Sequence, residues 1–194
     1  MKTLTEGEKP AYLGLLNTIA NAETNAGVYL RAWADVTDND DLACTLRFVA
    51  ARETSHGEVF CRRIHELGFE LRRKPDPEAA ARLARVANPD LCDLDKLPPR
   101  NAESGDPFKG IKQGLEQGEY DALTANLLSW YITEEYDSAR RLREAYSCVR
   151  ETVAGGRARI NGAPSHDAEA MMACMTAGFA RLEKSIEKLA KAVK

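Results

Sequence analysis

Several features that mark secreted, membrane-bound or cysteine-ligated proteins are missing from this sequence. Its five cysteines are scattered without a Cys-x-x-Cys pair, which excludes a zinc ribbon, a rubredoxin-type iron site and a thioredoxin-like motif. The first eight residues lack the apolar stretch of a signal peptide, and no apolar run is long enough to span a bilayer. We therefore expect a cytoplasmic protein without a membrane partner, whose free cysteines are mostly buried.

A large excess of one charge is also missing. The net charge is only −3, and the basic clusters at 62–63, 72–74 and 140–141 are short. Nothing in this balance suggests nucleic acid as a partner. The length of 194 residues suits one domain, residues 1–194, and the apolar fraction of 44% is ordinary for a globular protein.

Apolar residues recur at helical spacing in four stretches, and no strand-like alternation competes with them. The predicted helices cover about residues 10–36, 41–67 and 107–153, and a fourth begins at Ser165 and carries its apolar stripe to Leu189. Prolines between residues 69 and 106 exclude a long helix there, so this segment is predicted as a crossover with one short helix at about 77–87. The sequence therefore predicts an all-α fold, a four-helix bundle with a long crossover between its second and third helices.

Glycines mark both ends of the third helical stretch. Gly110, Gly114 and Gly118 lie four residues apart near its start. This spacing fits the close approach of another helix, and it also fits a weak first segment before the main helix. At the other end, the Ala-Gly-Gly run at 154–156 is expected to end the helix near Val153.

An acidic residue interrupts the apolar stripe near the middle of three predicted helices. Glu23, Glu53 and Glu135 each have apolar residues seven positions before and after them. Because a residue seven along returns to nearly the same helix face, all three carboxylates should point into the bundle. His56 follows Glu53 by three and shares its face. Glu134 is an alternative to Glu135, although its own neighbours seven away form a mixed face.

The positions of these groups along the helices also agree. Glu23 lies about fifteen residues before the first turn and Glu53 about fifteen after it, so they should meet at one level. Counting in the same way from the loop between the third and fourth predicted helices places Glu135 at the level of Glu183. Buried carboxylates must be protonated, paired with Arg or Lys, or neutralised by a divalent cation. Carboxylates and a neutral imidazole suit iron, manganese or zinc.

The order of these residues and helices resembles that of the ferritin-like superfamily of carboxylate-bridged dimetal proteins. It consists of Glu on the first helix, Glu53-x-x-His56 on the second, the crossover, and Glu on the third. The resemblance implies a di-iron site in which Glu23 and His56 bind one metal, Glu53 bridges, and Glu135 binds the second. It implies oxidation of ferrous iron or reduction of peroxide, an external electron donor and a homo-oligomer such as a dimer. Glu183 is a weaker ligand, because Ile186 stands where many relatives repeat the histidine.

The alternative is a degenerate bundle without metal chemistry that acts as a binding or interaction module. The missing histidine on the fourth helix and the proline-rich crossover favour it. The buried carboxylates would then pair with the imidazole or with nearby arginines, which are Arg31, Arg47 and Arg52. Three aromatic residues beside Glu135 either pack in the core or line a redox site or access path, namely Trp130, Tyr131 and Tyr136.

Overall fold

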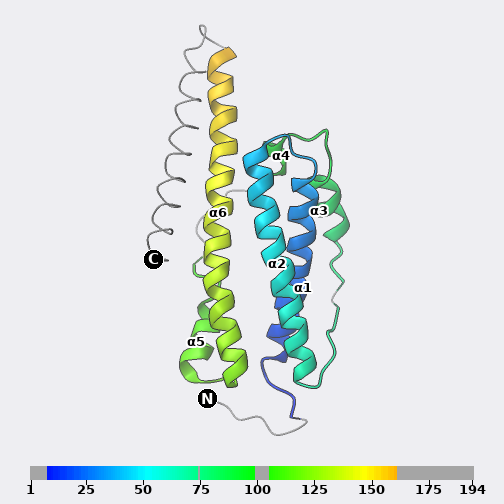
Figure 1. Cartoon of the computed structure of the whole chain (residues 1–194), viewed down its shortest axis with the longest axis vertical. Coiled ribbons are helices and arrows are strands. Elements are labelled where there is room, and N and C mark those ends of the chain that lie inside the picture. The colour runs from blue at the N-terminus through cyan, green and yellow to red at the C-terminus, as the bar shows by residue number, and fades with distance from the viewer. Residues whose placement is uncertain (1–7, 74, 99–104, 161–194) are drawn as a thin grey trace, which may run out of the picture. The chain divides into compact units, whose positions relative to one another are not determined.

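The computed structural model describes residues 8–73, 75–98 and 105–160, and all regular secondary structure in these ranges is α-helical (Figure 1). The all-α class is thereby confirmed for the described residues. The predicted fourth helix, which begins at Ser165, lies outside them. The chain divides into two compact units, Met1–Glu151 and Thr152–Lys194, and the packing and the site described below belong to the first. None of the described helices is both long and apolar enough to cross a membrane.

Helices α1 (Leu13–Ala34) and α2 (Asp40–Glu66) form an antiparallel pair joined by a short turn (Figure 1). The side chain of Asn39 caps α2 by accepting a hydrogen bond from the backbone N of Leu42 at 3.0 Å. Gly68, with φ of 83°, follows the end of α2 in the left-handed conformation that glycine adopts without strain. The predicted bounds of both helices therefore agree with the structure to within three residues.

The two helices approach each other closely at two glycines. A Cβ atom added to Gly27 would lie 2.4 Å from Oγ1 of Thr54 on the other helix. The arrangement is reciprocal, since a Cβ added to Gly57 would lie 2.5 Å from Oγ1 of Thr24. Glycine is needed at both places because any side chain would force the helices apart. This contact brings the middles of α1 and α2, which carry the predicted acids, to the same level.

The segment between α2 and the next long helix contains two short helices, α3 (Ala79–Val86) and α4 (Asp93–Lys96). Helix α3 confirms the short helix predicted in the crossover and packs against α1 (Figure 1). The carboxylate of Asp93 accepts hydrogen bonds from Nε1 of Trp33 at 2.7 Å and Oγ1 of Thr37 at 2.6 Å. These bonds attach the crossover to the end of α1.

The third helical stretch consists of two helices, α5 (Lys109–Gln117) and α6 (Ala122–Ile160). Gly118, with φ of 69°, ends α5, so the glycines mark a separate first segment and not a continuous helix. A Cβ added to Gly114 would lie 2.6 Å from the hydroxyl oxygen of Tyr120, so the absent side chain makes room for this ring.

Helix α6 runs seven residues beyond its predicted end near Val153. The prediction was wrong because glycine weakens a helix without removing a backbone donor. Each of the two glycines at 155–156 lowers helix stability by about 1 kcal/mol relative to alanine, whereas proline also removes an N–H group.

Two clusters of buried apolar side chains hold α1, α2 and α6 together. The first includes Leu16, Phe60 and Leu128, and the second includes Trp33, Leu46 and Val149. Full burial of a side chain such as Leu16 contributes about 1.5–3 kcal/mol. On each of the three helices, the predicted acid lies in sequence between residues of the first cluster and residues of the second. A polar level therefore lies between two apolar ones.

A buried arginine that the apolar pattern did not predict connects the end of α2 with the start of α6. Arg63 is 8% exposed and donates to Oγ1 of Thr124 at 2.9 Å and to Oδ1 of Asp121 at 2.8 Å. The hydroxyl of Tyr12 donates to the other oxygen of Asp121. This network closes the end of the bundle at which α6 begins.

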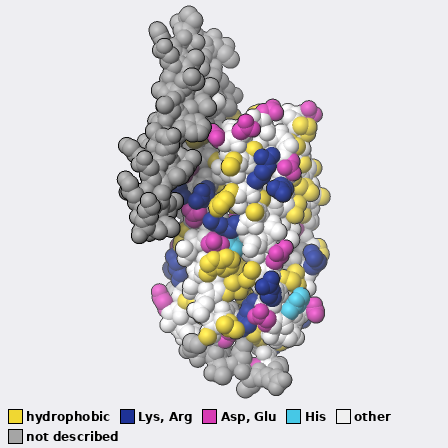
Figure 2. Space-filling model, viewed as in Figure 1, with side chains coloured by type: hydrophobic (Ala, Val, Ile, Leu, Met, Phe, Trp, Pro, Cys, Tyr) yellow, Lys and Arg dark blue, Asp and Glu magenta, His cyan; other side chains and the backbone are white. Residues whose placement is uncertain are grey.

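The surface mixes both charges, and its cysteines are more accessible than expected. Acidic and basic side chains are interspersed over the described part of the face in Figure 2, in keeping with the small net charge. Cys44, Cys92 and Cys148 are exposed, and Cys61 is partly buried. The prediction of mostly buried thiols was therefore wrong for the described residues, because these cysteines lie off the apolar stripes.

Candidate metal centre

Four of the five predicted ligands meet at the polar level between the two apolar clusters. Glu23 comes from α1, Glu53 and His56 from α2, and Glu135 from α6, and one ligand atom of each lies within 4.8 Å of all the others. The exposed fractions are 7% for Glu23, 4% for Glu53 and 0% for His56, while Glu135 is partly buried. The fifth predicted ligand, Glu183, lies outside the described residues.

Three atoms of this cluster are buried and form no hydrogen bond with any described residue. They are Oε2 of Glu53, Nδ1 of His56 and Oε1 of Glu135. Nδ1 of His56 lies 3.1 Å from Oε1 of Glu135 and 3.6 Å from Oε2 of Glu53, without the alignment of a hydrogen bond. Buried polar atoms nearly always have a partner, so three that converge without one indicate a shared partner. A cation could satisfy all three together.

The other nitrogen of His56 is held from the opposite side. Nε2 lies 2.9 Å from Oε2 of Glu134, which is well placed to accept its hydrogen. With the proton on Nε2, the lone pair of Nδ1 points towards Glu53 and Glu135. Successive residues of a helix lie about 100° apart, so Glu135 reaches the inner nitrogen and Glu134 the outer one. Glu134 therefore orients the imidazole from outside the cluster.

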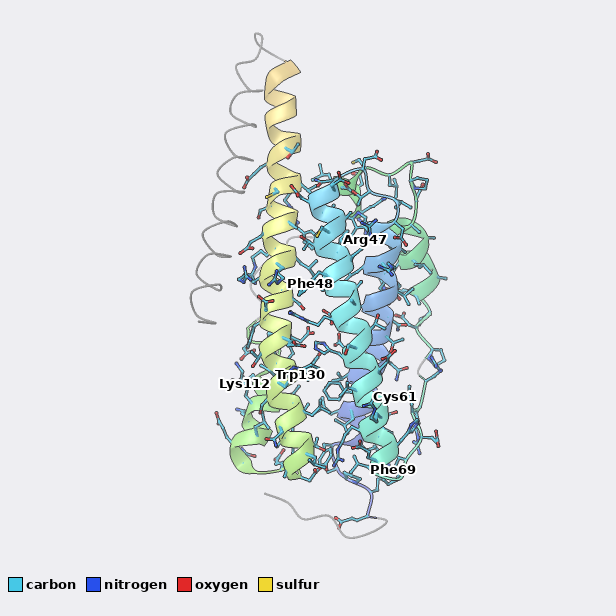
Figure 3. The ribbon with its side chains drawn as sticks, in the orientation of Figure 1. Arg47, Phe48, Cys61, Phe69, Lys112 and Trp130 are labelled. Carbon is cyan, nitrogen blue, oxygen red and sulfur yellow. The ribbon has the colours of Figure 1, made fainter. Side chains whose placement is uncertain are left out.

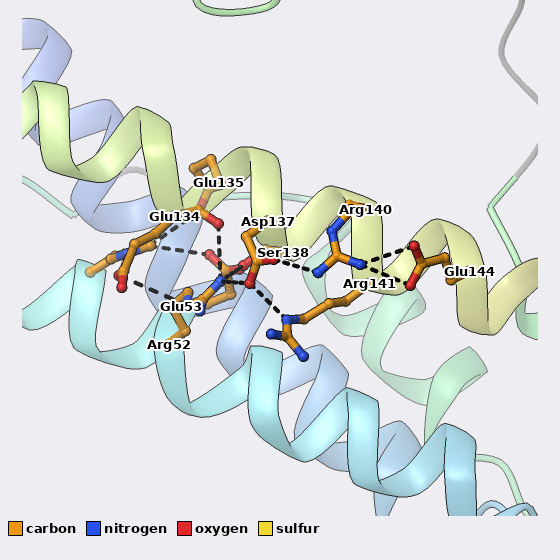
Figure 4. Close-up of polar contacts among 10 residues, drawn as sticks. Arg52, Glu53, Glu134, Glu135, Asp137, Ser138, Arg140, Arg141 and Glu144 are labelled. Carbon is orange, nitrogen blue, oxygen red and sulfur yellow. Dashed lines mark hydrogen bonds and ion pairs between the residues drawn. The ribbon is translucent and has the colours of Figure 1, made fainter. Parts of the chain in front are cut away.

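Glu134 is in turn fixed by an arginine of α2 (Figure 4). Nη1 of Arg52 donates to the backbone oxygen of Glu134 at 3.1 Å, to Oδ2 of Asp137 at 3.1 Å and to Oγ of Ser138 at 3.2 Å. Nε of Arg52 lies 3.9 Å from the Glu134 carboxylate. Arg52 thus belongs to an outer polar layer that connects α2 with α6.

No arginine or lysine in the described part of the chain forms an ion pair with an acid of the inner cluster. Arg52 pairs with the outer layer, and Arg47 lies 3.9 Å from Asp35 and donates to the backbone of Ala34. The expected pairing of buried carboxylates with arginine is therefore not observed among these residues. Protons, the imidazole or a metal ion must balance the charge of the cluster.

Two aromatic residues of α6 contact the cluster, and a third does not. The hydroxyl of Tyr131 donates to Oε1 of Glu23 at 2.6 Å, and its ring packs edge-on against His56, with 5.2 Å between centroids. Trp130, labelled in Figure 3, also packs edge-on against His56, at 4.9 Å, and is 38% exposed. Tyr136 bonds to Asp106 at the surface instead. Trp130 is thus an aromatic contact between solvent and the buried imidazole.

Burial and mutual repulsion favour protons in the cluster. Burial, together with the adjacent carboxylate of Glu53, raises the pKa of Glu23 to about 8, although the hydrogen bond from Tyr131 opposes the change. Burial disfavours the imidazolium of His56, but three carboxylates, those of Glu135, Glu53 and Glu134, outweigh it and raise its pKa to about 10. At neutral pH the cluster without metal therefore holds two protons that metal ligation would displace.

Comparison with models of protein families, with curated proteins and with solved structures finds no match for this chain. The geometry and chemistry of the cluster are therefore the basis for assigning a function.

Proposed function

We propose that this chain is a ferritin-like metal-binding protein in which Glu23, Glu53, His56 and Glu135 hold iron, in full occupancy as a di-iron centre. The observation that carries the proposal is the convergence of three buried, unpartnered ligand atoms from two helices. Glu23 adds a carboxylate from a third helix. Manganese and zinc accept the same oxygen and nitrogen donors and are the other candidate ions.

The donor set fits a divalent ion in size and charge. Metal–ligand distances of about 2.0–2.2 Å place the donors of one ion within about 4.4 Å of one another, and the four donor atoms here already lie within 4.8 Å. Three ionised carboxylates and a neutral imidazole carry three negative charges, so one divalent ion leaves one negative charge and two divalent ions leave one positive charge. Each carboxylate has two oxygens, so Glu53, which interacts with both Glu23 and His56, is suited to bridge two ions.

Bound iron would supply one-electron chemistry towards oxygen or peroxide. The residues of the chain prepare the site for it. Glu134 holds the proton of Nε2 so that Nδ1 of His56 is free to coordinate. Tyr131 fixes one oxygen of Glu23. The apolar clusters on both sides limit access of water along the bundle, and repeated turnover requires an electron donor from outside the chain.

A second candidate function has its own supporting observation. The raised pKa values of Glu23 and His56 mean that two protons can neutralise much of the cluster without a metal. A metal-free bundle that acts as an interaction module is therefore physically possible. The two candidates differ in whether the protein binds metal at all.

Metal analysis by mass spectrometry, on protein purified without chelators, separates them. We expect about one to two iron or manganese ions per chain, lost in His56→Ala and retained in His65→Ala. His65 is the matched control because it lies on the same helix but has a side chain that is 49% exposed. Ferrous iron added without oxygen should then bind and become oxidised when air is admitted. Absence of metal before and after reconstitution would leave the interaction module as the function.

A further inference from the structure

A hollow of about 440 Å³ lies between the first turns of α1 and the chain segment that leaves α2. Its apolar surface includes Leu13, Gly14 and Pro75, and its charged groups are Lys9, Arg72 and Arg73. The volume falls within the range of about 300–1,000 Å³ that is usual for small-molecule sites. None of the four ligands of the proposed metal centre lines it.

The charge of this hollow is of one sign, unlike the rest of the described surface. None of the described residues that line it is acidic. Lys9, Arg72 and Arg73 form no ion pair with a described residue, whereas Arg82, Arg140 and Arg141 do. Three cations without acidic partners, around an apolar floor, favour an anionic ligand.

The backbone that carries the two arginines is fixed on α1. Oδ1 of Asn17 accepts from the backbone N of Arg72 at 2.7 Å, and Nδ2 of Asn21 donates to the backbone O of Arg72 at 3.0 Å. Asn21 donates its second hydrogen to the backbone O of Asn17. Because the amides are used to hold the segment, the cationic side chains are the groups left to recognise a ligand.

A glycine leaves the hollow open although the fold does not require one there. A Cβ added to Gly14 would meet no atom within 4 Å, and its φ is not in the left-handed region. Alanine in a helix is more stable than glycine by up to about 1 kcal/mol, so neither packing nor backbone conformation explains this residue. A larger side chain at position 14 would occupy the hollow.

We propose that this hollow binds a small molecule that carries a phosphate group next to an apolar part. Guanidinium groups bind phosphate oxygens in pairs, and three cations match a phosphate dianion better than a single carboxylate. Leu13 and Pro75 form the surface against which the apolar part lies. This proposal does not rest on the metal centre.

Calorimetric titration of the full-length protein with phenyl phosphate, inorganic phosphate and phenol tests it. Phenyl phosphate should bind, inorganic phosphate more weakly, and phenol not at all. Arg72→Gln with Arg73→Gln should reduce the affinity at least about ten-fold, whereas Arg140→Gln, at an exposed ion pair of α6, should leave it unchanged. A second experiment measures co-sedimentation of the protein with phosphatidic acid vesicles. Binding to these vesicles without binding of phenyl phosphate would assign the phosphate group to a lipid headgroup.

Gly14→Leu separates loss of the site from loss of the fold. We expect it to abolish binding of phenyl phosphate while the thermal midpoint stays at or above that of the unaltered protein, because leucine favours the helix. Unchanged binding in Gly14→Leu, or no binding of phenyl phosphate and of vesicles by the unaltered protein, would overturn the proposal.

Discussion

Replacing Glu134 by alanine tests the division of this site into an inner cluster and an outer orienting layer. The change removes the 2.9 Å contact with Nε2 of His56 but none of the four proposed ligands. The imidazole can then turn or carry its proton on Nδ1, so part of the binding energy is spent on restoring its orientation. Loss of such a partner typically weakens metal affinity by about 10–100-fold, which corresponds to about 1.4–2.8 kcal/mol.

The assay is competition for ferrous or manganous ion against a chelator of known affinity, with metal content measured at equilibrium. Glu134→Gln should recover part of the affinity, because its side-chain oxygen still accepts from Nε2 without the negative charge. Glu144→Ala, an exposed acid of α6 paired with Arg140, should have no effect. A loss in Glu134→Ala as complete as in His56→Ala would make Glu134 a direct ligand, and affinity equal to that of the unaltered protein would refute an orienting role.

Three further predictions concern the packing and charges around the site. Gly57→Ala should lower the free energy of unfolding by about 1–3 kcal/mol and weaken metal binding, since the added Cβ would lie 3.1 Å from the backbone N of Thr24 on α1. Gly14→Ala is the control, and equal stability of the two variants in urea titrations would contradict the close approach of the two helices. Metal binding at pH 7 should release protons from Glu23 and His56, whose pKa values are raised to about 8 and about 10, so metal affinity should increase with pH between 6 and 9. Calorimetry in buffers of different ionisation enthalpy measures the number of protons released, and a result of no protons released would show that the metal-free cluster holds none. Burial opposes ionisation of Asp121, but hydrogen bonds from Thr124, Tyr12 and an arginine lower its pKa below the usual 3.8, so its contribution to stability should be complete above about pH 4 and be lost below that. Asp121→Asn should lower the free energy of unfolding by about 1.5–3 kcal/mol at neutral pH and remove this acid dependence, and a pH profile of stability parallel to that of the unaltered protein would count against it.

The spacing of seven residues between each acid and its apolar neighbours predicted the inner cluster, because ligands and core residues must lie on the same buried helix face. Glu23, Glu53 and Glu135 replace apolar residues on faces that must be buried, so helical periodicity alone places them together. The short first turn then sets the level of Glu23 and Glu53, which the reciprocal glycine contacts reinforce.

Features that depend on partners distant in sequence could not be predicted in this way. The role of Glu134 depends on the orientation of an imidazole 78 residues earlier. Arg63 lies seven residues after His56, on the buried face, but its burial is tolerated only because Asp121 and Thr124 are brought to it by the start of α6. The end of α6 was missed for a different reason, since two glycines weaken a helix without preventing its continuation.

The cluster can exist in two states of charge, and the difference between them bears on function. With protons on Glu23 and His56, much of the buried negative charge is balanced. Nδ1 of His56 then meets Oε1 of Glu135 at 3.1 Å and Oε2 of Glu53 at 3.6 Å as ion pairs, but these three polar atoms still lack aligned hydrogen bonds. Such atoms cost about 1–3 kcal/mol each when left unsatisfied. A bundle that needed only stability would have a lower free energy with apolar residues at this level. An ion that binds the same atoms removes that penalty, which is why metal binding is the better explanation of a polar level in the middle of an apolar core.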